Sequence, residues 1–128
     1  MTELSAPEKV WRGARAAHGK KAEGLIILDL TGLSTVSDYF LICSGRSTVQ
    51  IRIIADAIEE ELGEAGFPCL GREGQPESGW ILLDYGELVV HIFLEETRAY
   101  YALERLWGDA PAVAPTEDWG LILTRGPW

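Results

Sequence analysis

The turn at 44–47, which reads SGRS, contains the residues best suited to chemistry on an anion. It falls between an apolar strand and a predicted helix, where backbone amides and an arginine can hold a negative group. Metal-assisted phosphoryl transfer at such a turn also requires clustered carboxylates that hold Mg²⁺. The next acid, Asp56, lies in the middle of the predicted helix, and no Asp-x-Asp or Asp-x-Glu pair follows on a strand. We therefore interpret the turn as a capped helix start rather than a catalytic site.

The histidines and cysteines form no recognisable catalytic or metal-binding motif. His91 lies within an apolar run, VVHIF, where a lone histidine is more often a core residue than a base. Cys43 and Cys69 belong to no CxxC pair, and isolated cysteines of this kind are typically small buried residues in a reducing compartment. The sequence therefore predicts no catalytic residue, no metal and no cofactor.

A second group of residues is suited to binding a protein. Trp80, Leu82 and Tyr85 are predicted to form an aromatic and apolar patch. Acidic residues surround this patch in the sequence, namely Glu73, Glu77, Asp84 and Glu87. An apolar centre with a charged rim is the usual anatomy of a protein interface. The alternative, in which Trp80 packs inward as part of the core, stays open on the pattern alone.

A β-hairpin must position these residues. The segments 80–83 and 87–94 are rich in strand-favouring residues, and Asp84-Tyr85-Gly86-Glu87 between them has turn composition. Gly86 can adopt the positive φ that such a turn requires. The second segment is apolar at both alternating positions, so we expect it to be buried on both faces and central in its sheet.

The other elements follow from periodicity and capping signals. Strands are expected at 25–30, 38–43 and 67–73, and helices at 7–18, from Ser47 to Gly66, and from about 96 through Trp107. The apolar face of the middle helix is predicted from residues at helical spacing: Val49, Ile53, Ile54, Ala57, Ile58 and Leu62. The order is α-β-β-α-β-β-β-α, which predicts an α/β (α+β) fold with a mixed five-stranded sheet flanked by helices.

Composition limits the partners. The chain has 128 residues, a net charge of −9 and a pI near 4.6. Such a surface repels phosphate backbones, so free nucleic acid is excluded as a direct ligand and a basic protein is favoured. The alternative that the acidity only maintains solubility stays open. The first residues lack a signal peptide and no apolar run approaches the ~20 residues of a membrane span, so we expect a cytoplasmic protein with no membrane partner.

Several segments together resemble the ribosomal silencing factor family, RsfS, also called Iojap. The similar segments are 20–23 (KKAE), 28–29 (LD), 37–40 (SDYF), 42–45 (ICSG), 54–56 (IAD), 73–74 (EG), 80–86 (WILLDYG), 90–93 (VHIF) and 101–111 (YALERLWGDAP). The combination of DYG and VHIF with LERLWGDAP is specific. The resemblance covers about residues 7–111, which defines a domain at 1–111 and a C-terminal tail at 112–128.

The resemblance implies a fold like that of nucleotidyltransferases without their catalytic acids. It implies that the protein binds the fourteenth protein of the large ribosomal subunit and thereby prevents the subunits from joining. Translation would then fall when nutrients are limiting, and the free protein would be a homodimer. The family's partner-binding residues correspond to Trp80, Leu82, Asp84 and Tyr85, together with Glu73 and Gly74.

Two other functions stay open at this point. One is a small nucleotidyltransferase-like enzyme that uses Ser44, Gly45 and Asp84 with Mg²⁺ and a nucleotide. The other is an adaptor whose partner is not the ribosome.

Overall fold

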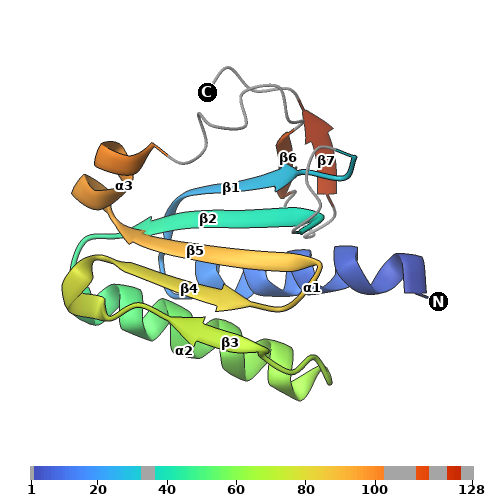
Figure 1. The fold of residues 1–128 in the computed structure, drawn as a ribbon, viewed down its shortest axis with the longest axis horizontal. Coiled ribbons are helices and arrows are strands. Elements are labelled where there is room, and N and C mark those ends of the chain that lie inside the picture. The colour runs from blue at the N-terminus through green and yellow to red at the C-terminus, as the bar shows by residue number, and fades with distance from the viewer. Residues whose placement is uncertain (1, 33–36, 103–111, 116–120, 125–128) are drawn as a thin grey trace.

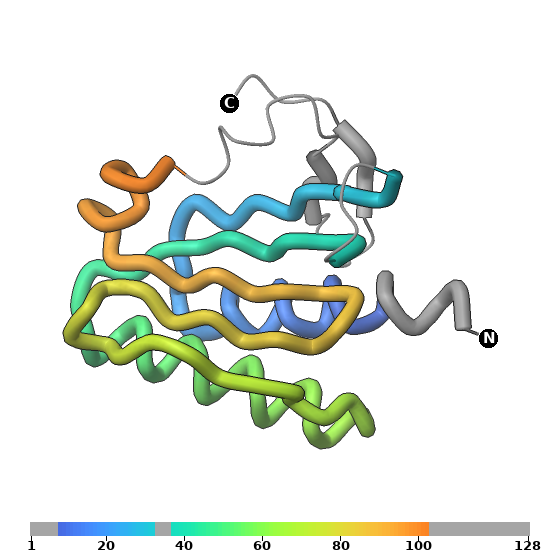
Figure 2. Tube along the Cα trace, viewed as in Figure 1, coloured from blue at the N-terminus to red at the C-terminus, as the bar shows by residue number. Residues whose placement is uncertain are grey.

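The computed structural model describes residues 2–32, 37–102, 112–115 and 121–124 (Figures 1 and 2). Its elements are α1 (Thr2–Gly19), β1 (Glu23–Asp29), β2 (Tyr39–Gly45), α2 (Thr48–Glu64), β3 (Gly71–Glu73), the 3-10 helix η1 (Pro76–Ser78), β4 (Trp80–Asp84), β5 (Leu88–Leu94), α3 (Glu95–Tyr101), β6 (Ala112–Pro115) and β7 (Leu121–Thr124). The predicted order of helices and strands through α3 is confirmed. None of the helices in the described part of the chain has the length and apolar character needed to cross a bilayer.

The strands form a single mixed sheet in the order β3-β4-β5-β2-β1-β6-β7. The pair β2–β5 is parallel and the other pairs are antiparallel. The predicted five-stranded mixed sheet corresponds to β3 through β1 in this order and is confirmed. As predicted, β5 is central, and six of its seven residues are buried.

Helices α1 and α2 lie together on one face of this sheet, while α3 lies beyond the ends of β2 and β5 (Figure 1). The main core fills the space between the two long helices and the sheet. It contains alternate residues of each central strand, such as Leu41 and Cys43 of β2 and Val90 and Ile92 of β5. The residues between them in sequence point to the other face, where a smaller cluster forms around Ile42 and Phe93. The two faces of the sheet therefore have different coverings.

The start of α2 is capped as predicted. Ser47 Oγ accepts a hydrogen bond from the Gln50 backbone N–H at 3.0 Å. The buried side of the helix contains Ile51, Ile54, Ala55, Ile58 and Leu62. Apolar residues occupy two overlapping stripes of this helix, and packing on the sheet selects the stripe centred on Ile54 and Ile58. The prediction that Val49 and Ile53 belong to the buried face was wrong, because both are exposed.

The β4–β5 hairpin has the predicted turn. Gly86 has a φ of +84°, and its N–H donates to Asp84 Oδ1 at 2.8 Å. The Tyr85 N–H closes the turn on the Leu88 carbonyl oxygen at 2.8 Å. This turn sets the register in which Leu82 lies opposite His91.

Several predicted boundaries were wrong. Helix α1 begins at Thr2 rather than at residue 7, and the strand predicted at 67–73 is limited to Gly71–Glu73. Helix α3 ends at Tyr101, because Ala102 adopts a left-handed conformation with a φ of +46°. The rest of the predicted helix, including Trp107, lies outside the described residues. Where the sequence predicted a tail, β6 pairs with β1 and β7 pairs with β6.

Candidate partner-binding site

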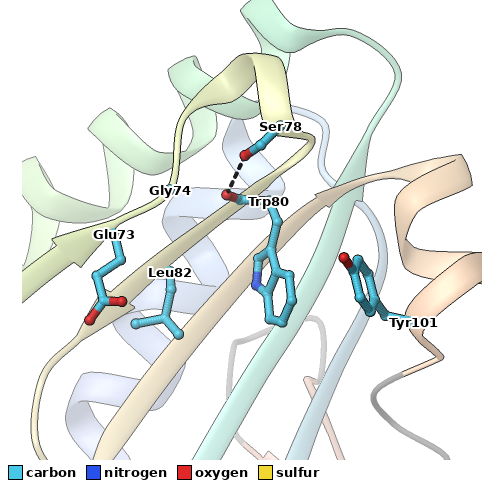
Figure 3. Close-up of a pocket in the computed structure, with 6 residues that line it drawn as sticks. All are labelled: Glu73, Gly74, Ser78, Trp80, Leu82 and Tyr101. Carbon is cyan, nitrogen blue, oxygen red and sulfur yellow. Dashed lines mark hydrogen bonds between the residues drawn. The ribbon is translucent and has the colours of Figure 1, made fainter.

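A pocket of about 280 Å³ lies on the sheet face opposite α1 and α2. Its walls are formed by Glu73, Gly74, Ser78, Trp80, Leu82 and Tyr101 (Figure 3). Four of the six predicted binding residues line it, namely Glu73, Gly74, Trp80 and Leu82. They come from β3, the loop that follows it, and β4, which are adjacent at one side of the sheet.

Strand alternation brings these side chains to one face. Along β4, Ile81 and Leu83 are buried toward the helices, whereas Trp80, Leu82 and Asp84 are half-buried on the opposite face. The pairing of β3 with β4 adds Glu73 to this face, since Glu73 lies directly opposite Leu82. Asp84 shares the face but does not line the pocket, and its carboxylate accepts the Gly86 N–H within the turn.

The indole of Trp80 is held by contacts on several sides. Its Nε1–H donates a hydrogen bond to Nδ1 of His91 at 3.2 Å. Its ring centroid lies 4.9 Å from that of Phe93 and 5.0 Å from that of Tyr101. The side chain is therefore neither sealed in the core nor freely exposed. It packs on the small cluster and presents its remaining surface to the pocket.

His91 supports this arrangement from beneath. Its side chain is 4% exposed, and burial lowers its pKa to about 4, so the imidazole is neutral at physiological pH. Because Nδ1 accepts the Trp80 N–H, the ring proton lies on Nε2. Within the described part of the chain, Nε2 has no hydrogen-bond partner. The ring of Phe40 packs edge-on against the imidazole, with centroids 4.6 Å apart.

The loop above the indole depends on Gly74. Its φ is +88°, and a Cβ at this position would lie 2.1 Å from the Trp80 carbonyl oxygen. Only glycine permits this close approach of the loop to β4. Ser78 closes the loop, since its hydroxyl donates to the Gln75 carbonyl oxygen at 2.7 Å and lies 3.5 Å from the Trp80 carbonyl oxygen (Figure 3).

One acidic side chain, Glu73, lines the pocket. Glu73 is exposed, and among the described residues its carboxylate forms no hydrogen bond and no ion pair. Glu77, which was also predicted at the rim, is exposed in η1 but does not line the pocket. The aromatic surface of the pocket is thus bordered by carboxylate charge that the described residues leave uncompensated.

Tyr85 does not join this group, which corrects the predicted patch. Tyr85 lies on the same face of the sheet as Ile81 and Leu83, and its side chain is 2% exposed within the main core. Burial raises the pKa of its phenol. Glu87, predicted at the rim, instead forms an ion pair with Lys9 of α1 at 2.6 Å. The helix-facing side of the hairpin therefore has a structural role.

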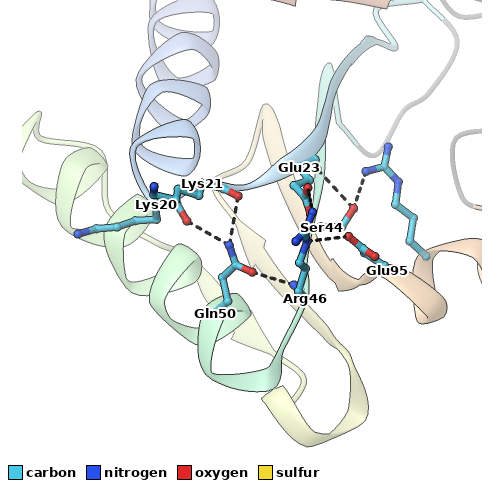
Figure 4. A network of polar contacts seen from close by, with 8 residues as sticks. Lys20, Lys21, Glu23, Ser44, Arg46, Gln50 and Glu95 are labelled. Carbon is cyan, nitrogen blue, oxygen red and sulfur yellow. Dashed lines mark hydrogen bonds and ion pairs between the residues drawn. The ribbon is translucent and has the colours of Figure 1, made fainter.

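The turn at 44–47 is occupied by internal contacts (Figure 4). Arg46 forms two hydrogen bonds with the Glu23 carboxylate, at 2.8 and 2.9 Å, and this pairing lowers the pKa of Glu23. Ser44 Oγ accepts a hydrogen bond from Arg98 Nη1 at 2.8 Å. Gln50 Oε1 accepts a hydrogen bond from the Arg46 backbone N–H, and Gln50 Nε2 donates to the carbonyl oxygens of Lys20 and Lys21. The polar side chains of this turn are therefore engaged in contacts that join the ends of neighbouring elements, which is a structural role.

The residues of the alternative enzyme are not brought together. Ser44 is level with Phe93 and Trp80 across the sheet, whereas Asp84 lies four residues farther along β4, roughly 13 Å in the strand direction. The described residues contain no group of at least three His, Cys, Asp or Glu side chains that could hold a metal ion.

Sequence reasoning missed three contributors to the pocket region: Ser78, His91 and Tyr101. The position of His91 was available from the hairpin register, because cross-strand and diagonal neighbours contact one another. Tyr101 had no such signal, since its place depends on the direction that α3 takes after β5.

The comparisons with known proteins agree with this architecture. The family model described as "Ribosomal silencing factor during starvation" matches residues 3–123. The ribosomal silencing factor RsfS of Bacillus subtilis is 47% identical over 98 residues, which cover 77% of this chain and 83% of that protein. The chloroplastic protein Iojap of Zea mays is 34% identical over 100 residues, covering 78% of this chain and 43% of that protein.

More distant relatives and solved structures extend the comparison. A mouse protein named "Mitochondrial assembly of ribosomal large subunit protein 1" is 30% identical over 91 residues, covering 69% of this chain and 40% of that protein. A crystal structure from Chromobacterium violaceum superposes with a TM-score of 0.79 at 32% identity, covering 81% of this chain and 87% of that one. A crystal structure from Bacillus halodurans superposes with a TM-score of 0.74 at 38% identity, covering 84% of this chain and 98% of that one. This chain belongs to the ribosomal silencing factor family.

Proposed function

We propose that this protein binds the large ribosomal subunit through its fourteenth protein, at the face that meets the small subunit. Occupying that face prevents the subunits from joining and lowers translation when nutrients are short. The single observation that supports this most strongly is the exposed pocket around Trp80, in which aromatic and apolar side chains are bordered by the Glu73 carboxylate. That combination suits a protein partner with a basic surface.

The charge of the chain favours such a partner over its surroundings. A ribosomal protein embedded in RNA is basic, so a protein with a net charge of −9 is attracted to it. The same charge is repelled by the RNA phosphates on either side. Electrostatics therefore directs the protein to a basic protein surface and away from rRNA.

Blocking requires occupancy and no chemistry. A standard interface buries about 800 Å² on each partner, which is enough for a stable complex of a 14.1 kDa chain. In this proposal the protein is not an enzyme, acts in the cytoplasm and forms a homodimer when it is not bound to the subunit. These three features are the ones that the family resemblance implies.

Sedimentation through sucrose gradients tests the proposal. Purified protein mixed with separated subunits should migrate with the large subunit and reduce the fraction of joined ribosomes. The variant Trp80→Ala should do neither. Leu70→Ala is the matched control, because Leu70 is a large apolar residue that is 66% exposed and does not line the pocket. Wild-type protein that remains at the top of the gradient with unchanged subunit joining would contradict the proposal.

A further inference from the structure

We infer that the pocket of Glu73, Trp80, Leu82 and Tyr101 binds the side chain of a single arginine from the protein partner. The inference rests on the proposed function, because it specifies what the partner inserts at this site. It also assigns Tyr101 and the Glu73 carboxylate defined roles in recognition.

The pocket offers aromatic surface to a cation. Trp80 is half-buried and Tyr101 is 51% exposed, with ring centroids 5.0 Å apart and planes inclined at 49°. Both rings line the same pocket (Figure 3). Indole and phenol faces attract guanidinium groups through the ring quadrupole, and the planar guanidinium also stacks on them. Cation binding therefore uses surface that the fold leaves exposed.

The carboxylate of Glu73 completes the recognition of a cation. It lines the pocket, and within the described residues it has no cationic partner. Several other carboxylates are paired internally, as in Glu23–Arg46 and Glu61–Arg12. A carboxylate beside an aromatic wall can accept two N–H groups from a guanidinium at once.

The remaining wall suits the aliphatic part of an arginine. Leu82 lies opposite Glu73 in the β3–β4 register and is half-buried. Long basic side chains place their methylene groups on apolar surface and keep the charged end near polar partners. The volume of about 280 Å³ is also at or below the lower limit of ~300 Å³ for small-molecule sites, which favours one inserted side chain over a cofactor.

Other occupants fit less well. An anion would meet the carboxylate of Glu73. A purely apolar side chain would remove water from that carboxylate without pairing it, which costs binding free energy. A lysine would pair with the carboxylate, but its compact ammonium does not stack on the rings as a guanidinium does.

Nuclear magnetic resonance with side-chain analogues tests the inference directly. Nα-acetyl-arginine methylamide should shift the Trp80 indole N–H signal and the Gly74 and Ser78 amide signals of the full chain. The neutral citrulline analogue should not, and the lysine analogue should give smaller shifts. Loss of the indole signal in Trp80→Phe identifies it. Absence of shifts with the arginine analogue, or equal shifts with citrulline or with lysine, would overturn the inference.

Matched carboxylate variants connect the pocket to the partner. Glu73→Gln should abolish the response to the arginine analogue and weaken binding to the large subunit about fivefold, with a smaller salt dependence. Glu77→Gln removes an exposed carboxylate that does not line the pocket and should behave as wild type. If wild-type protein fails to bind the subunit, the proposed function fails while the analogue titration still tests the pocket. Subunit binding that is unchanged in Glu73→Gln would overturn the inference alone.

Discussion

The Nε1–H of Trp80 donates its hydrogen bond to Nδ1 of His91, at 3.2 Å across the β4–β5 hairpin. This bond connects a half-buried indole, which we propose contacts the partner, to a buried neutral imidazole. The indole consequently has one polar atom satisfied on the side that faces the sheet, and its orientation is set before any partner arrives. A preorganised aromatic residue loses less side-chain entropy on binding.

Replacing Trp80 by alanine should reduce partner binding by about 2 kcal/mol or more, because tryptophans at interface centres are frequent hot spots. Affinity for the large subunit measures this directly. Circular-dichroism melts show whether the variant remains folded, which we expect, with a lower melting temperature because Phe93 loses a ring contact. Wild-type affinity in a folded Trp80→Ala protein would contradict the prediction.

Stability should fall as the pH decreases toward 4 because of His91. Burial lowers its pKa to about 4 in the folded protein, whereas the unfolded chain titrates near 6.5, so the unfolded state binds more protons between these values. The free energy of unfolding should therefore decrease as the pH falls from about 6.5 to 4, by about 3 kcal/mol in total from this residue.

Urea unfolding of the wild type and His91→Asn at several pH values isolates that contribution. Asparagine can still accept the Trp80 N–H but does not titrate in this range. The difference in stability between the two proteins should change across the window, and the carboxylates common to both cancel. A constant difference would show that His91 is not the responsible group.

The variant Tyr85→Phe should bind the large subunit as the wild type does. Tyr85 packs in the main core, on the sheet face away from the pocket, so its hydroxyl cannot contact a partner there. In the described residues no hydrogen-bond partner of this hydroxyl is present, so its removal should change the free energy of unfolding by less than about 1 kcal/mol. Lost binding in a stably folded Tyr85→Phe would restore this residue to the interface.

Gly74→Ala should distort the loop above Trp80. The added Cβ would meet the Trp80 carbonyl oxygen, and the positive φ is unfavourable for alanine, so we expect a loss of stability of about 1–3 kcal/mol. Subunit binding should weaken at the same time. Gly71→Ala is the control, because a Cβ there has no atom within 4 Å. Equal stability of the two variants by chemical unfolding would be inconsistent with the described loop.

Nucleotides with Mg²⁺ should not raise the melting temperature of the protein. A ligand that binds only the folded state stabilises it by an amount that increases with the logarithm of the ligand concentration above the dissociation constant. Thermal-shift measurements with the common nucleoside triphosphates provide the test. A Mg²⁺-dependent increase that disappears in Ser44→Ala would instead support the alternative of a nucleotidyltransferase-like enzyme.

Local sequence signals predicted the hairpin and the capped start of α2, since both depend on a few adjacent residues such as Gly86 and Ser47. Tyr85 was misplaced for a reason visible in the sequence. Trp80 and Leu82 share one alternation and Tyr85 has the other, so an unbroken strand up to the turn places them on opposite faces. The predicted patch combined both faces.

Features that depend on packing were not predictable in the same way. Val49 and Ile53 lie on an apolar stripe of α2 that is as regular as the buried one, and only the position of the sheet distinguishes the two. Tyr101, which lines the pocket, is the last residue of α3 before the left-handed Ala102, and its place depends on the direction that α3 takes after β5. The left-handed alanine at that point has no composition signal.

Strand β3 forms one border of the sheet and has only the residues Gly71–Glu73. Such a short border exposes few backbone groups to a neighbouring molecule, and its Arg72 and Glu73 are charged. Arg72 also pairs with Asp56 and Glu59 of α2, which holds that border against its own helix. The β3 margin of the sheet is therefore a poor template for strand addition by a second molecule.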